Sequence, residues 1–181
     1  MTAIKKYPII QFIGIPIIGA ALIIIMARQI DLFAILRFEL LIIFGYIAAI
    51  LDLKAKRIPN TLVLAMFVSW VLIMTPKLFV DTDEAIRLLI DSIVGLATGG
   101  GIFLLMYVIS RKGLGGGDVK FMAATGLYIG FSGALTVMLC GTILAALTGL
   151  ALILLKKIGR KDSIPLAPFL YAGILITLFL S

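Results

Sequence analysis

Long apolar runs with almost no charged side chains recur along this chain, and they restrict its fold more than any other feature. The run Ala134–Leu155 contains no charged residue, and a helix needs only about 20 apolar residues to cross a bilayer. The chain is 62% hydrophobic and 14% charged, whereas soluble domains are about half apolar and a quarter charged. A β-barrel would show short segments of alternating polarity instead. The sequence therefore predicts an all-α, polytopic membrane helix bundle.

About seven membrane spans are expected, or six to seven because two of them are short for a bilayer. They are Pro8–Ala27, about Phe38–Leu51, Thr61–Thr75, a long helix from Thr82 or Asp83 to about Ser110, Val119–Gly130, Ala134–Leu155, and a last span that ends at Ser181. A tight turn is expected at residues 131–133. The four-residue spacings of glycine and alanine in the fourth and sixth spans predict close helix packing. We expect one integral membrane domain over residues 1–181.

The distribution of positive charge predicts the orientation. With the N-terminus in the cytoplasm, only four of the 16 Lys and Arg residues fall on the outer side, as the positive-inside rule requires. We therefore expect a multi-pass protein of the cell membrane with a cytoplasmic N-terminus. The net charge of +7 belongs to these cytoplasmic segments, so the lipid bilayer is an expected partner and nucleic acid is not.

Few side chains are available for catalysis. The chain has one cysteine, Cys140, and no histidine. A zinc site built from the usual ligands is therefore excluded, and so is a Ser–His hydrolase. No metal or other cofactor is expected, and carboxylates remain as the candidate catalytic groups.

The stretch Gly113–Lys120 stands out because four glycines precede a single carboxylate, Asp118. Each glycine costs roughly 1 kcal/mol in a helix relative to alanine, so a loop is expected, with a backbone that another chain can approach closely. A carboxylate at the edge of a membrane segment is costly unless it has a partner or a function. The order Gly115-x-Gly117-Asp118 also matches the G-x-G-D signature of intramembrane aspartyl proteases.

The expected topology places a second carboxylate, Asp52, at the same cytoplasmic boundary as Asp118. The third cytoplasmic acid, Asp162, lies in a basic loop where a solvated charge is expected. Two carboxylates brought close cannot both ionise comfortably, so they share a proton. The ionised group can then activate water while the protonated group donates to the substrate. This pair is therefore suited to peptide hydrolysis without a metal or a histidine.

Two other interpretations of the acids are open from the residues alone. Both could simply pair with neighbouring bases such as Lys54, Arg57 or Lys120. They could also be cation or proton sites of a small transporter or channel component, a role that predicts acids near the bilayer midplane rather than at one boundary.

Three motifs in this order resemble the type IV prepilin peptidase family, which includes archaeal preflagellin peptidases. The motifs are Asp52 followed by Ile58-Pro59-Asn60, then Gly115-x-Gly117-Asp118-Val119-Lys120, then Ile164-Pro165-Leu166-Ala167-Pro168-Phe169. Many relatives have Phe-Gly where this chain has Leu166-Ala167. A presenilin-like protease would share G-x-G-D, but that family has tyrosine before its first aspartate, where this chain has Leu51.

The resemblance implies an aspartic endopeptidase that cleaves the short basic leader of type IV prepilin-like proteins at the cytoplasmic membrane face. It implies a catalytic pair formed by Asp52 and Asp118. It also implies that the substrate contacts the motif residues Pro59, Asn60, Gly115, Gly116, Gly117, Lys120, Pro165 and Pro168. Larger relatives carry an extra cytoplasmic domain with paired cysteines, associated with N-methylation, which we do not expect here. The resemblance says nothing about oligomeric state.

Overall fold

The computed structural model describes residues 31–110, 113–157, 159 and 163–180. Every regular element in these ranges is a helix, and the order is α2 (Leu32–Ala55), α3 (Asn60–Val80), α4 (Thr82–Ile109), α5 (Gly116–Leu154) and α6 (Ala167–Leu180). By length and composition α2 to α5 could each cross a membrane, and α6 is a shorter apolar helix. The all-α prediction is confirmed for the described residues, and a polytopic membrane bundle fits them.

The helical run α5 is interrupted at Gly130, where the backbone has φ 71° and ψ −169°. Glycine is required at this point for two reasons. A φ of this sign is unfavourable for residues with a side chain, and a Cβ would overlap the carboxylate of Asp91 on α4. The same carboxylate accepts a hydrogen bond from the backbone N–H of Phe131 at 3.1 Å. Asp91 therefore holds the start of the helical segment that follows the break.

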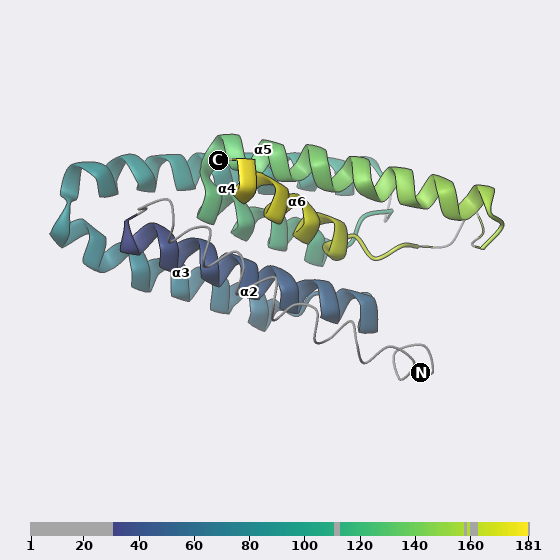
Figure 1. Cartoon of the computed structure of the whole chain (residues 1–181), viewed down its shortest axis with the longest axis horizontal. Helices are drawn as coiled ribbons and strands as arrows, with labels where there is room; N and C mark the ends of the chain where they lie inside the picture. Colours follow the sequence, from purple (N-terminus) through teal and green to yellow (C-terminus); the bar gives the residue numbers. More distant parts are fainter. Residues whose placement is uncertain (1–30, 111–112, 158, 160–162, 181) are drawn as a thin grey trace.

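The chain reverses direction at this break, so α5 has two arms (Figure 1). The first arm runs antiparallel to α4, and the second returns beside α6. Glycines allow both contacts, because a Cβ on any of them would approach the facing residue closely. The facing pairs are Gly95 with Gly126, Gly99 with Met122, Gly141 with Leu170, Gly149 with Ile164, and Gly173 with Val137. The expected packing role of these small residues is thereby confirmed.

The expected count of about seven spans is not supported. The described residues contain four long apolar helices and one short one. The first expected span, Pro8–Ala27, lies outside the described residues. The turn expected at residues 131–133 is helical, because Gly130 alone makes the break. The expected second and third spans fall within α2 and α3, which extend beyond the apolar runs at both ends, and the fourth agrees closely with α4. The expected fifth and sixth spans both lie in α5 except for Leu155, and the last corresponds to α6.

Figure 1 shows α2 and α3 together on one side, the arms of α5 with α4 on the other, and α6 between them. The contacts agree, because α6 packs on both α2 and α5. Three elements begin at the same end of the bundle, namely α3, α5 and α6, and α2 and α4 end there. We call this the site end. Large apolar side chains such as Leu105, Val108 and Leu139 remain exposed on outer faces, as a bilayer requires.

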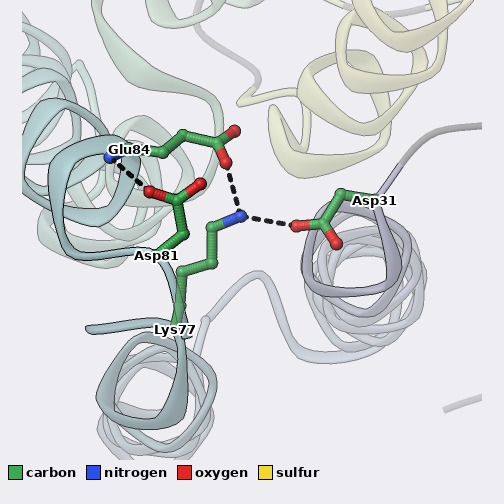
Figure 2. Close-up of polar contacts among 4 residues, drawn as sticks. All are labelled: Asp31, Lys77, Asp81 and Glu84. Carbon is green, nitrogen blue, oxygen red and sulfur yellow. Dashed lines mark hydrogen bonds and ion pairs between the residues drawn. The ribbon is translucent and has the colours of Figure 1, made fainter. Parts of the chain in front are cut away.

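An ion cluster fastens three helices at the opposite end (Figure 2). Lys77, in the last turn of α3, is buried, and its Nζ lies 2.7 Å from both Asp31 Oδ2 and Glu84 Oε2. Asp81 caps α4 by accepting a hydrogen bond from the backbone N–H of Glu84 at 3.1 Å. The cluster links the starts of α2 and α4 to the end of α3.

Candidate active site

Asp52 is buried in the last turn of α2, at the site end. Its Oδ2 accepts a hydrogen bond from the backbone N–H of Ala167, at a distance of 2.9 Å. Ala167 is the first residue of α6, and the first N–H groups of a helix have no partner within that helix. They also carry a partial positive charge that favours a carboxylate. The start of α6 therefore fixes the orientation of the Asp52 side chain.

This contact explains the third sequence motif. Pro165 fixes the backbone that leads into α6, and the backbone amides of Leu166 and Ala167 then face the Asp52 carboxylate. The donor is a backbone group, and alanine supplies it as well as glycine does. Alanine in place of the glycine common in the motif that this chain resembles therefore leaves the contact intact.

Asp118 is partly buried in the first turn of α5. Its Oδ2 accepts a hydrogen bond from the backbone N–H of Gly115 at 3.2 Å, so the side chain folds back on the residue that precedes its own helix. The other oxygen, Oδ1, is buried and has no hydrogen-bond partner among the described residues. A buried carboxylate oxygen without a partner is costly. One oxygen of Asp118 is thus held, and the other is available for a proton or a substrate.

The glycines before Asp118 provide space rather than an unusual backbone conformation. Among the described glycines only Gly130 has a positive φ. A Cβ on Gly115 would lie 2.8 Å from Asp118 Oδ2, and one on Gly117 would lie 3.2 Å from both the Cβ and the carbonyl oxygen of Ile58. A Cβ on Gly116 would meet nothing within 4 Å. Two of the three glycines are therefore needed for packing, and Gly116 leaves open space.

One cavity of about 180 Å³ joins these groups at the site end. Its lining comes from the end of α2, the following loop and the start of α5. The lining residues are Asp52, Lys56, Arg57, Ile58, Gly115, Gly116, Gly117 and Asp118. The two aspartates are close enough for their charges to interact. The end of α2 and the start of α5 thus form a site with two carboxylates, and the start of α6 orients one of them.

Two residues expected to contact substrate are bonded to each other beside this cavity. Lys120 Nζ donates to Asn60 Oδ1 at 2.9 Å. They stand at one end of an open apolar groove of about 460 Å³ between α3 and α5, whose other lining residues are Thr61, Val63, Leu64 and Phe67. Neither Asn60 nor Lys120 is part of the cavity lining. The groove begins close to the cavity, because Asn60 follows Ile58 and Lys120 follows Asp118 at an interval of two residues.

The three prolines of the motifs are not part of the cavity lining. Pro59 precedes the first residue of α3, and Pro165 and Pro168 flank the Ala167 amide. Simple charge pairing of the two acids is not seen, because neither Asp52 nor Asp118 forms an ion pair among the described residues. The salt bridges there join Lys77 to Asp31 and to Glu84. Sequence reasoning missed the Ala167 amide, since a backbone donor leaves no signature in residue type.

Comparison with known proteins supports the same region. The model of the type IV leader peptidase family matches residues 39–152, which include both aspartates and the glycine stretch. No solved structure matches this chain significantly.

Curated relatives carry the same description. The chain is 29% identical over 148 residues to a prepilin leader peptidase/N-methyltransferase of Legionella pneumophila, covering 82% of this chain and 50% of the relative. It is 26% identical over 133 residues to the protein of that name from Bacillus subtilis, covering 70% of this chain and 48% of the relative. The chain thus spans about half the length of these relatives.

Proposed function

This chain belongs to the type IV leader peptidase family, and on that premise we propose that it is a membrane aspartic endopeptidase. Its proposed substrates are type IV prepilin-like proteins, whose short basic leader it removes. The proposal covers peptide hydrolysis only. The N-methyltransferase activity in the names of the relatives is not carried over to this chain.

The observation that carries the proposal is the pair of carboxylates in one cavity. Asp52 and Asp118 come from different helices, and each is oriented by a backbone N–H through one oxygen. A catalytic pair must be held in a fixed geometry before the substrate arrives, and backbone donors in a packed helix bundle provide this. The other oxygen of Asp118, Oδ1, has no hydrogen-bond partner among the described residues and is available for the reaction.

The proposed reaction uses the two acids in different protonation states. The ionised carboxylate takes a proton from water as the water oxygen attacks the carbonyl carbon of the scissile peptide bond. The protonated carboxylate donates its proton to the carbonyl oxygen. The tetrahedral intermediate then collapses and the C–N bond breaks. The leaving nitrogen receives the proton that was taken from water, and a hydroxyl of the intermediate returns its proton to the other carboxylate as the new carboxyl group forms. Acid and base are regenerated within the pair, so no further reactant is consumed except water.

Substrate binding is proposed at two adjacent places. The residues around the scissile bond lie in the cavity beside Gly116, where there is open space. The apolar helix of the substrate lies along the groove that begins at Asn60 and Lys120. Lys56 and Arg57 carry the same charge as the basic leader and repel it. Apolar contact in the groove therefore supplies the binding energy.

The site end is proposed to face the cytoplasm, as the positive-inside distribution predicts. A transporter or channel role for the two acids is not favoured, because it does not account for the family membership.

The test is incubation of the purified protein, in detergent or reconstituted vesicles, with a leader-bearing prepilin. We expect a single cut that releases the leader, identified by mass spectrometry of both fragments. A prepilin with its leader junction deleted is the matched control and should remain intact. An uncut parent substrate would refute the proposed function.

A further inference from the structure

Lys56, the residue that follows α2, connects the end of this helix to the segment that leads into α6. The backbone N–H of Lys56 donates to the carbonyl oxygen of Asp52 at 2.8 Å. Its Nζ donates to the carbonyl oxygen of Ser163 at 2.8 Å and to the Ser163 hydroxyl at 3.2 Å. From Ser163 the chain runs through Pro165 to Ala167, whose amide returns to the Asp52 carboxylate. We call residues 163–167 the strap.

Lys56 holds an unfavourable backbone conformation to make these contacts. Its φ of 50° and ψ of 38° lie in the left-handed region, which carries a steric cost for a residue with a side chain. Glycine would adopt this conformation without that cost. A lysine at this position therefore indicates a role for its side chain, which is the bond to Ser163.

We propose that Lys56 is a positioning residue for catalysis, which acts on Asp52 through the strap. The hydrogen bonds from its ammonium group hold Ser163 beside the end of α2. Because Pro165 restricts the backbone of the strap, this contact also positions the Ala167 amide against the Asp52 carboxylate. This inference rests on the proposed peptidase function. It assigns to Lys56 a role in the chemical step rather than in binding the leader, whose positive charge it repels.

Three substitutions at one position test the proposal. Lys56→Met removes the charged donor and keeps the length of the side chain, and we expect kcat to fall roughly three- to tenfold with KM nearly unchanged. Lys56→Gly relaxes the backbone but also removes the donor, so it should lose activity as well. Lys56→Arg keeps a cation and should recover most of the rate. Lys54→Met is the control, because Lys54 is exposed two residues before Lys56 and has no hydrogen bond to the strap.

A second measurement does not depend on activity. In a Cys140→Ala background, the rate at which Ile164→Cys reacts with a polar maleimide reports how tightly the strap is held. We expect Lys56→Met and Lys56→Gly to accelerate labelling, and Lys54→Met to leave it unchanged. Full kcat in Lys56→Gly, or unchanged labelling in Lys56→Met, would overturn the proposal. If the parent protein cuts no prepilin, the proposed function fails, while the labelling result still decides whether Lys56 holds the strap.

Discussion

The carboxylate of Asp52 accepts a hydrogen bond from the backbone N–H of Ala167, 115 positions later in the chain, at 2.9 Å. This contact joins the end of α2 to the start of α6 at the site end of the bundle. Because α6 packs on both α2 and α5, the bundle fixes the helix that carries this amide, and the strap that leads into α6 adjusts its first residue. The geometry of one proposed catalytic acid therefore depends on a helix outside the first two motifs.

The three glycines before Asp118 should differ in their tolerance of a side chain. Gly115→Ala places a Cβ against the Asp118 carboxylate, and Gly117→Val presses on Ile58. We expect each to lower the cleavage rate roughly 10- to 100-fold, since displacement of a catalytic group by about 1 Å has effects of this size.

Gly116→Ala is the matched control for folding, because its Cβ meets open space. It should insert and unfold like the parent protein. A reduced kcat/KM in this variant would support a substrate backbone that passes beside Gly116. Full activity of Gly115→Ala and Gly117→Val would show that the packing seen here is not required for cleavage.

Filling the groove should weaken substrate binding. Leu64 is an exposed groove residue on α3, and Leu64→Trp adds bulk without disturbing the core. We expect KM for a full-length prepilin to rise several-fold while kcat changes little. Leu105→Trp, on an exposed part of α4 outside the groove lining, should leave KM unchanged. An equal effect of both tryptophans would argue against the groove as a binding surface.

The ion cluster at the opposite end should contribute to stability rather than to cleavage. Lys77→Met removes the cation that joins Asp31 and Glu84. Both acids are about half exposed, so water can solvate them again, and we expect the free energy of unfolding to fall by only about 1 kcal/mol. Denaturation in detergent, followed by helical circular dichroism, measures this. Loss of activity without loss of stability would contradict the assignment.

The lengths of the apolar runs, the composition and the distribution of positive charge were sufficient to predict the helical class and the shared end of Asp52 and Asp118, because insertion in a bilayer leaves a strong signature in the sequence. The contacts that orient the acids were not predictable. The donors to Asp52 and Asp118 are backbone N–H groups of Ala167 and Gly115, which any residue except proline supplies. Lys56 appeared only as one positive charge among several in a loop.

Local charge spacing was also a poor guide to partners. Asp91 and Glu84 lie at helical spacing from Arg87, which favours pairs along one helix. Glu84 instead binds Lys77 on α3, and Asp91 accepts the Phe131 amide at the α5 reversal. Contacts between helices satisfied these acids because the bundle brings α3 and both arms of α5 beside α4.

The orientation of the bundle can be measured with single cysteines in a Cys140→Ala background. Ala55→Cys lies at the site end and Asp83→Cys at the opposite end, and both positions are exposed. In intact cells, an impermeant maleimide should label Asp83→Cys, and Ala55→Cys should react only after the membrane is opened. The reverse pattern would place the site on the outer face and contradict cleavage of a cytoplasmic leader.

Replacing each aspartate by asparagine tests the two-carboxylate account most directly. Asparagine keeps the size of aspartate and can still accept the Ala167 or Gly115 hydrogen bond, but it cannot hold or exchange the catalytic proton. Asp83→Asn, at an exposed position in the first turn of α4, is the control. The measurement is conversion of full-length prepilin to its mature form on a gel, with the amount of enzyme determined in the same membranes. The account predicts near-background processing by Asp52→Asn, by Asp118→Asn and by the double variant, without additive losses, and parent-level processing by Asp83→Asn. Cleavage at the parent rate by either single dyad variant would contradict it.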